Sequence, residues 1–154
     1  MSLRAEPARP HDVEEALDLL RRADLPGKDV AEQFGHYFVV HEDDGRVVGV
    51  AGLEPHGEDG LLRSVAVNSD YRRQGLGASL VEAALERAAQ LDLGAVFLLT
   101  TDARDYFARQ GFTECPRDEA PAAIRKSWEF ETGCPSTAVF MKRPVAGRNQ
   151  ASEG

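Results

Sequence analysis

The spacing of apolar residues near the start of the chain predicts a helix. Within Pro10–Arg22 the apolar positions follow one helix face: Val13, Ala16, Leu17 and Leu20. Asp12 stands where a helix N-cap is expected, and Leu25-Pro26-Gly27 ends the pattern. We expect a short strand over Leu3–Glu6 before this helix and a short helical segment over Asp29–Phe34 after it.

The next apolar runs have the short length and β-branched composition of strands. Tyr37–Val40 and Val47–Leu53 are separated by Asp43-Asp44-Gly45, a sequence typical of a hairpin turn. A second turn over His56–Gly60 leads to a third strand, Leu61–Val67. This part of the chain therefore predicts an antiparallel meander.

The second half of the chain alternates between helical and extended patterns. A long helix follows Gly75 and Gly77, with these apolar residues on one face: Leu76, Leu80, Val81, Ala84, Leu85 and Ala88. Gly94 stands where its C-cap is expected. The later predicted elements are a fully apolar strand (Ala95–Leu99), a helix (Asp102–Arg109) stopped by Gly111, a helix (Ala120–Phe130) and a strand (Ala138–Met141).

This order of elements predicts one α/β domain with three layers. A mixed, mostly antiparallel central sheet would be flanked by helices. The 154 residues fit a single compact domain. We expect residues 1–145 to form it and the polar residues 146–154 to form a loose tail.

Charge and composition exclude several classes of function. Lys and Arg number 18 against 26 Asp and Glu, and the net charge of −8 argues against nucleic acid and anionic membranes as partners. No secretory signal or membrane-spanning run is apparent, so we expect a cytoplasmic protein. Cys115 and Cys134 are interpreted as structural thiols, and the absence of a Cys/His cluster or paired His predicts no metal.

The strongest chemical signal lies between the third strand and the long helix. There the segment Arg72–Ala78 contains Arg72, Arg73, Gln74, Gly75, Leu76, Gly77 and Ala78. Glycine lets the backbone approach a ligand closely, and a helix N-terminus presents free N–H groups with partial positive charge. The two arginines add local cations to an acidic chain. The pattern predicts a phosphate or pyrophosphate site, although glycines needed only for packing are the alternative.

The same segment resembles the signature Arg/Gln-x-x-Gly-x-Gly/Ala of the GNAT acetyltransferases. The preceding Val65-Ala66-Val67 resembles the strand whose backbone pairs with the pantetheine arm, and Tyr106-Phe107 with Gly111-Phe112 resembles the downstream helix–turn motif. The resemblance implies that acetyl-CoA is the cosubstrate. It assigns Val65, Ala66, Val67, Arg72–Ala78, Thr100 and Phe107 to the cofactor.

A closer resemblance is to the arsenic-resistance N-acetyltransferase-like proteins and the acetyltransferase domain of N-acetylglutamate synthase. It rests on Gly52–Pro55, Leu61–Val67, Leu98–Thr101 and Cys134–Met141. The sequence also departs from the family. The general-base Glu of many relatives corresponds to Leu61, and the Tyr that protonates the thiolate corresponds to Phe107. The Ser that replaces this Tyr in the synthase corresponds to Ala103, and two arginines near its bound glutamate correspond to Pro135 and Ser136.

Other residues must therefore supply the acid, the base and the acceptor contacts. Arg63 lies two residues from Leu61, so in a regular strand both face the same side. Its guanidinium would bind an acceptor carboxylate, with Ser64 beside it, while Glu54 relays the amine proton. The alternative is a structural Arg63–Glu54 ion pair. Tyr106 is a candidate acid, unless it is only a packed aromatic.

Four other side chains are candidates for the acceptor side of the site, and each has a structural alternative. Lys28 would line the acceptor mouth, or else be an ordinary surface lysine. Trp128 and Phe130 would wall the pocket, or else fill the core. His56 would be a proton shuttle, or else a solvated loop residue.

Together these features predict direct acetyl transfer to the amine of a small, carboxylate-bearing, amino-acid-like acceptor, with the amine attacking the thioester itself. A protein N-acetyltransferase and a non-catalytic acyl-CoA-binding module are the alternatives. We expect a monomer or a homodimer.

Overall fold

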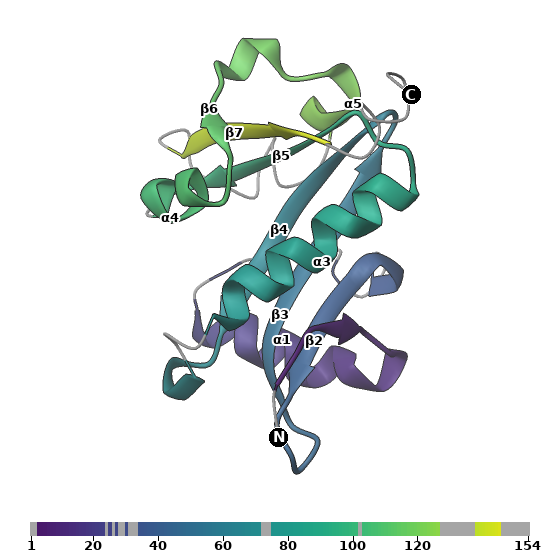
Figure 1. Ribbon diagram of the computed structural model, residues 1–154, viewed down its shortest axis with the longest axis vertical. Helices are drawn as coiled ribbons and strands as arrows, with labels where there is room; N and C mark the ends of the chain where they lie inside the picture. Colours follow the sequence, from purple (N-terminus) through teal and green to yellow (C-terminus); the bar gives the residue numbers. More distant parts are fainter. Residues whose placement is uncertain are drawn as a thin grey trace. The chain divides into compact units, whose positions relative to one another are not determined.

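The computed structural model describes residues 3–23, 25, 27, 30, 34–71, 75–101, 103–126 and 138–145. Its elements are β1 (Glu6–Pro7), α1 (Val13–Arg22), β2 (Tyr37–His41), β3 (Val47–His56), β4 (Asp59–Val67), α3 (Leu76–Gln90), β5 (Ala95–Thr100), α4 (Arg104–Arg109), β6 (Thr113–Glu114), α5 (Ala122–Arg125) and β7 (Val139–Pro144), as Figure 1 shows. The seven strands form one sheet in the order β1-β2-β3-β4-β5-β7-β6. The β4–β5 pair is parallel, whereas β1–β2, β2–β3, β5–β7 and β6–β7 are antiparallel. The predicted α/β class with a mixed, mostly antiparallel sheet is confirmed.

Residue contacts divide the chain into two compact units, and strands β3 and β4 each contribute residues to both of them. The first comprises residues 1–53 and 63–86. The side chains of its strand β2 point alternately to the two faces of the sheet, as is usual for successive strand residues. Tyr37 and Val39 pack in one apolar cluster with residues of α1, which we call the α1-side cluster. Phe38 and Val40 pack in another cluster with the start of α3, which we call the α3-side cluster. The first unit therefore has a helix on each face of its strands, with α3 in front and α1 behind in Figure 1.

The second unit comprises residues 54–62 and 87–154. Strand β5 is buried from Val96 to Thr100, as its continuous apolar run predicts. One apolar cluster joins β4, β5, β7 and α5: Leu61, Phe97, Leu99, Ala120, Ile124, Ala138 and Phe140. The rings of Phe97 and Phe140 stack within it, with centroids 5.3 Å apart.

The start of the first helix matches the prediction in position but not in hydrogen bonding. Asp12 is the N-cap residue of α1, as predicted, but its side chain makes no cap hydrogen bond there, and a 3-10 turn that begins at Pro10 precedes the helix. Arg9 takes the extended conformation of the N-cap, and its backbone N–H donates to Asp12 Oδ2 at 2.9 Å. The Asp12 carboxylate thus reaches back to the residue before the turn, as in a capping box.

The end of the long helix is also different. Helix α3 ends at Gln90, and Asp92 rather than Gly94 adopts the left-handed conformation, with a φ of 59°. Leu93 N–H donates to Ala88 O at 3.0 Å and Asp92 N–H to Ala89 O at 3.1 Å, which is a Schellman motif. Gly94 N–H instead donates to Glu58 O at 2.8 Å.

Other element boundaries also move, among them that of the final strand, which is Val139–Pro144 rather than Ala138–Met141. The first strand is Glu6–Pro7 rather than Leu3–Glu6. The turn predicted over His56–Gly60 is reduced to two residues, because β3 and β4 extend through His56 and from Asp59. The helix predicted over Ala120–Phe130 is α5, which ends at Arg125. Residues 127–137, most of Asp29–Phe34 and residues 146–154 lie outside the described residues.

Candidate functional site

A left-handed residue interrupts strand β4 in the first unit. Ser64 has a φ of 63°, and among the described residues only Asp92 shares a positive φ without being glycine. Such a conformation costs on the order of 1–3 kcal/mol unless its surroundings compensate, and it often marks functional sites. Adjacent strand residues normally point to opposite faces. Here the Arg63 Nε donates to Ser64 Oγ at 3.3 Å, so the two side chains meet on one side.

Tyr37 completes this cluster from the neighbouring part of the same unit. Its hydroxyl lies 3.2 Å from Ser64 Oγ. The ring lies against the backbone of Gly52, its partner in the β2–β3 register, where any Cβ would collide with the ring. Sequence reasoning missed Tyr37 and Gly52. The available signal was a glycine inside a predicted strand, which often marks a close approach.

The cluster is polar but almost fully enclosed. Relative exposure is 3% for Arg63, 6% for Ser64 and 1% for Tyr37. A buried guanidinium is costly without anionic or hydrogen-bonding partners, and its planar fork matches a carboxylate. The Arg63–Ser64–Tyr37 cluster therefore combines a fixed positive charge with two hydroxyl groups, which suits a small anionic group.

Glu54 and His56 lie together in the second unit, at the end of β3. Glu54 is buried, and its Oε1 lies 3.4 Å from His56 Nε2. His56 keeps part of its surface exposed. A buried carboxylate beside a partly exposed imidazole can pass a proton toward solvent. The Arg63–Glu54 ion pair stays a prediction.

The glycine-rich segment leads into α3. Gly75 has a φ of 79°, and a Cβ built there would find open space within 4 Å. Its carbonyl accepts the N–H of Ser79 at 3.1 Å, so Gly75 is where the helical hydrogen bonds begin. Leu76 is buried, whereas Gly77 is half-buried and Ala78 exposed. An open glycine at the start of a 15-residue helix fits an anionic ligand. Arg72, Arg73 and Gln74 lie outside the described residues.

Strand β4 ends with the three predicted pantetheine residues, and the 3-10 turn Ser69–Tyr71 lies between them and this segment. Val65 and Val67 pack with the α3-side cluster, whereas Ala66 packs with the α1-side cluster. The register of β4 with β5 covers only Gly60 and Leu61, although β4 continues to Val67.

Thr100, Tyr106 and Phe107 lie in the second unit at the start of α4. The Thr100 Oγ1 accepts the N–H of Ala103 at 3.0 Å, which supports the turn into the helix. Phe107 is buried and meets Tyr106 and Phe112 edge-to-face. Burial raises the pKa of the Tyr106 phenol, and the positive charge of Arg109 only partly offsets it. Tyr106 therefore holds its proton at neutral pH.

Several candidates fall on residues that the structure does not describe. Lys28, Trp128, Phe130 and Cys134 lie outside the described residues, and so do Pro135 and Ser136. In the part of the chain that is described, no three His, Cys, Asp or Glu residues come together as a metal site would require. None of the described helices has both the length and the apolarity needed to cross a membrane.

Comparison with known proteins gives consistent matches. Residues 2–112 match the Acetyltransferase (GNAT) family. The amino-acid acetyltransferases of Aliivibrio fischeri and Pseudomonas aeruginosa are 32% and 34% identical to this chain over 128 and 132 residues. These alignments cover 78% and 84% of the chain but only 29% of each relative.

Solved structures match over nearly all of the chain. N-acetylglutamate synthase from Neisseria gonorrhoeae, complexed with coenzyme A and N-acetyl-glutamate, gives a TM-score of 0.76 at 19% identity, covering 94% of this chain and 35% of that one. Rv2747 from Mycobacterium tuberculosis, solved in complex with CoA, gives 0.78 at 25% identity, covering 92% of this chain and 98% of that one. The first of these likenesses concerns the fold alone.

Proposed function

Since the chain belongs to the acetyltransferase (GNAT) family, we propose that it transfers acetyl from acetyl-CoA directly to the amine of a small, carboxylate-bearing, amino-acid-like acceptor. The observation that carries the acceptor class is the enclosed Arg63–Ser64–Tyr37 cluster. The names of the relatives, amino-acid acetyltransferase and N-acetylglutamate synthase, support the same class.

The donor side rests on the segment Arg72–Ala78. Its backbone N–H groups and arginines would bind the pyrophosphate of acetyl-CoA, and the open, left-handed Gly75 supports this assignment. The backbone of Val65–Val67 would position the pantetheine arm, and one of its N–H groups would polarise the thioester oxygen. Thr100 and Phe107 are assigned to the same ligand by family resemblance.

The acceptor side rests on Arg63. Its guanidinium would form two parallel hydrogen bonds with the acceptor carboxylate, and Ser64 would hold the guanidinium in place through the Nε contact. Lys28 would lie at the acceptor mouth.

The transfer itself is a displacement at the acetyl carbonyl carbon. The acceptor nitrogen forms the new C–N bond while the C–S bond breaks and the electron pair leaves with sulfur. The amine proton passes to Glu54 and then to His56, which lies beside it and reaches solvent. Tyr106, whose phenol is protonated at neutral pH, returns a proton to the thiolate.

One observation favours a second candidate, a non-catalytic acyl-CoA-binding module. Leu61, at the position of the family's general base, is buried in an apolar cluster with Phe97 and Ile124. A panel of amines with acetyl-CoA separates the two candidates. Release of CoA with a carboxylate-bearing amine supports the transferase, whereas CoA binding without release supports the module.

Arg63 gives the sharpest test of the acceptor class. Arg63→Ala should raise the acceptor KM by about one to three orders of magnitude, since removing one partner of a buried charged pair costs roughly 2–5 kcal/mol. Arg63→Lys should restore only part of the loss, because an ammonium lacks the planar fork. The exposed Arg4→Ala is the charge-matched control and should leave the acceptor KM unchanged. A folded Arg63→Ala enzyme with normal acceptor KM would contradict the proposal.

The structural alternative for Arg63 predicts a different pattern. If Arg63 serves only as the partner of Glu54, Arg63→Ala and Glu54→Ala should each lower the melting temperature. The double variant should then lose less than the sum, because the two residues would act as one pair.

A further inference from the structure

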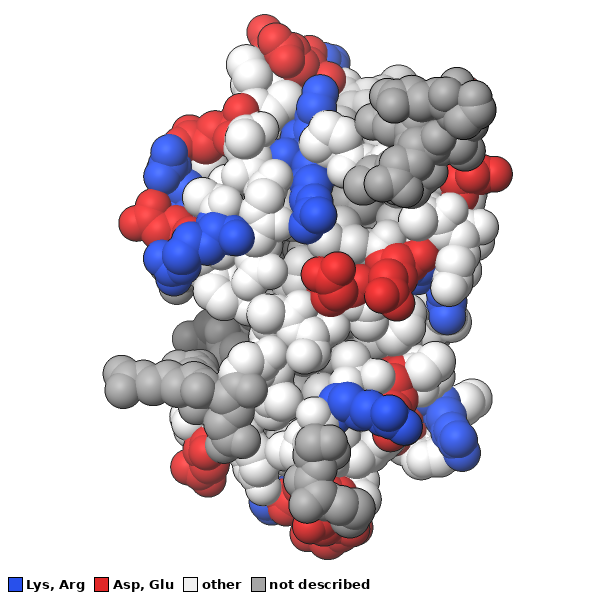
Figure 2. Space-filling model, viewed as in Figure 1, with Lys and Arg blue, Asp and Glu red and all other residues white. Residues whose placement is uncertain are grey.

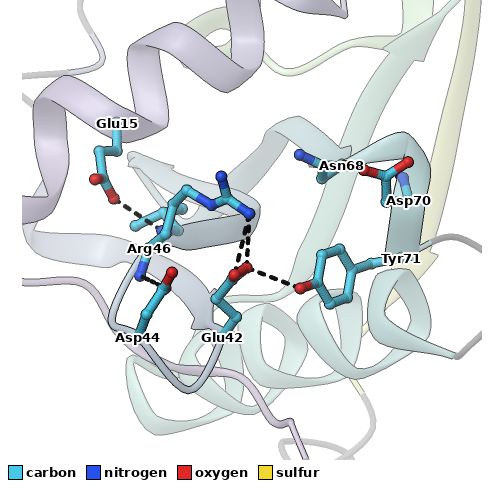
Figure 3. Close-up of polar contacts among 8 residues, drawn as sticks. Glu15, Glu42, Asp44, Arg46, Asn68, Asp70 and Tyr71 are labelled. Atoms are coloured by element: carbon cyan, nitrogen blue, oxygen red, sulfur yellow. Dashed lines mark hydrogen bonds and ion pairs between the residues drawn. The ribbon is translucent and has the colours of Figure 1, made fainter.

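Tyr71 connects two loops that are far apart in sequence. It ends a 3-10 turn over Ser69–Tyr71, directly before the proposed phosphate-binding segment. Its hydroxyl donates to Glu42 Oε1 at 2.8 Å, and Glu42 lies in the turn that joins β2 to β3 (Figure 3). The two residues are separated by 29 positions in the chain. This contact ties the exit of β4 to the β2–β3 hairpin within the first unit.

Arg46 fixes the same carboxylate from the other side of the hairpin. One guanidinium nitrogen donates to Glu42 Oε1 at 2.8 Å and to Oε2 at 3.0 Å. The Oε1 atom therefore accepts from both Tyr71 and Arg46, as Figure 3 shows. We name these three residues the Glu42 clamp. The hydrogen bond to Glu42 raises the pKa of Tyr71, which fits a phenol that donates to the carboxylate.

The backbone around the clamp is held on both sides. At the β4 exit, Asn68 N–H donates to Val48 O at 2.8 Å, and the Asn68 Oδ1 accepts the N–H of Asp70 at 2.9 Å. At the hairpin, Val47 N–H donates to Glu15 Oε1 of α1 at 2.8 Å. The Glu42 clamp thus joins two pieces of backbone that other hydrogen bonds already hold, the β2–β3 hairpin and the turn that ends at Tyr71.

We infer that Tyr71, Glu42 and Arg46 are positioning residues that hold the start of the segment Arg72–Ala78 for donor binding. This inference rests on the proposed pyrophosphate role of that segment. Backbone N–H groups bind an anion well only when the loop is already ordered, since any ordering cost is subtracted from the affinity. Tyr71 is bonded directly to Arg72, and the start of α3 at Gly75 fixes the other end. The clamp supplies the first of the two fixed ends.

The test compares two donors that differ in whether they carry a pyrophosphate. Tyr71→Phe keeps the ring, which packs in the α3-side cluster, and removes only the hydroxyl. We expect kcat/KM for acetyl-CoA to fall about three- to thirty-fold, and CoA affinity in isothermal titration to fall in parallel. With S-acetylpantetheine, which lacks the pyrophosphate, kcat/KM should stay unchanged, and so should the acceptor KM. For Glu42→Gln, kcat/KM for acetyl-CoA should lie between the values for wild type and Tyr71→Phe, because the amide oxygen can still accept the hydrogen bond of the Tyr71 phenol.

Tyr37→Phe provides a matched control in the same unit. It makes the same chemical change but removes the hydroxyl next to Ser64. Tyr37→Phe should raise the acceptor KM and leave unchanged the ratio of kcat/KM for acetyl-CoA to kcat/KM for S-acetylpantetheine.

Two contrary outcomes are distinguishable. In the first, Tyr71→Phe lowers kcat/KM equally for acetyl-CoA and S-acetylpantetheine, or lowers only the melting temperature. Either result would mean that the clamp merely stabilises the hairpin, so that the inference is wrong while the proposed function stands. If wild-type protein binds CoA no better than pantetheine, the pyrophosphate role of Arg72–Ala78 is wrong, and the inference is overturned with it.

Discussion

At the scale of single residues, the two proposed binding sites each contain a left-handed position, Gly75 in one and Ser64 in the other, and the two differ in character. Gly75 adopts its φ of 79° without strain and leaves open space where a side chain would stand. Ser64 adopts a φ of 63° with a Cβ, and its hydroxyl meets Arg63 and Tyr37. The open position suits the approach of a ligand to the backbone, whereas the filled one holds side chains in a fixed arrangement.

The first prediction separates charge from backbone conformation at Gly75. Asn and Asp are nearly isosteric and both tolerate the left-handed region better than other side chains. Gly75→Asp should weaken CoA binding by at least about tenfold more than Gly75→Asn, because only the aspartate brings a negative charge to the proposed pyrophosphate site. Isothermal titration with CoA measures the difference. Equal affinities in the two variants would place the phosphates elsewhere.

The site could be predicted from the sequence only in part. The glycine pattern identified Gly75, but its left-handed φ is visible only in the structure. Arg63 was found by assuming a regular strand, and Ser64 breaks that regularity immediately afterwards. No local signal predicts the break, since a serine within an apolar run has no preference for a positive φ. Tyr37 was missed because its role depends on a register with Gly52 that only tertiary structure defines.

At the scale of elements, Asp12 joins the beginning of α1 to strand β2. Burial raises the pKa of its carboxyl, but hydrogen bonds from His41, at 2.8 Å, and from the Arg9 N–H outweigh burial. The resulting pKa lies below the ordinary value of 3.8. A lowered folded-state pKa stabilises the fold above the unfolded-state pKa, and this contribution is lost as the pH falls through the folded-state value.

Asp12→Asn tests this linkage. The variant should be less stable by about 1–3 kcal/mol at pH 7, because a charged hydrogen-bonding group is lost. Its stability should fall less steeply than that of wild type below about pH 4, since the titrating group is gone. Denaturant unfolding at several pH values measures both effects, with Asp18→Asn, an exposed change on the same helix, as the control. Parallel pH profiles for Asp12→Asn and wild type would contradict the assignment.

Element types were predictable because they follow from periodicity, whereas element ends depend on hydrogen bonds that periodicity does not contain. Gly94 was the obvious helix stop, yet the Schellman bonds close at Asp92 and Leu93. Aspartate tolerates the left-handed region, so the chain turns two residues earlier than the glycine suggests.

At the scale of the whole molecule, the fold and family were predictable, while the acceptor was not. The order of strands and helices together with one glycine-rich segment is enough for an α/β domain of the acetyltransferase (GNAT) family. The proposed acceptor site depends on Arg63, Ser64 and Tyr37, which only tertiary structure brings together. The chain also spans only 29% of the length of the amino-acid acetyltransferases that it matches. On the face shown in Figure 2, acidic and basic side chains both occur among the described residues, so the net charge of −8 is not spread evenly as negative charge over that face.

The last prediction concerns the kinetic mechanism of the proposed acetyl transfer. Direct transfer requires acetyl-CoA and acceptor to be bound together, whereas a cysteine intermediate would allow each to bind in turn. Burial raises the pKa of the Cys115 thiol, and the nearby Glu119 carboxylate adds to the effect. At neutral pH Cys115 is therefore a protonated, weakly nucleophilic thiol.

Varying both substrates should give intersecting initial-rate lines, and the double variant Cys115→Ser with Cys134→Ser should keep kcat within about twofold of wild type. Intact-mass measurement after incubation with acetyl-CoA alone should show no added acetyl group. Parallel rate lines, or an acetylated cysteine lost in the double variant, would replace direct transfer with a two-step mechanism through sulfur.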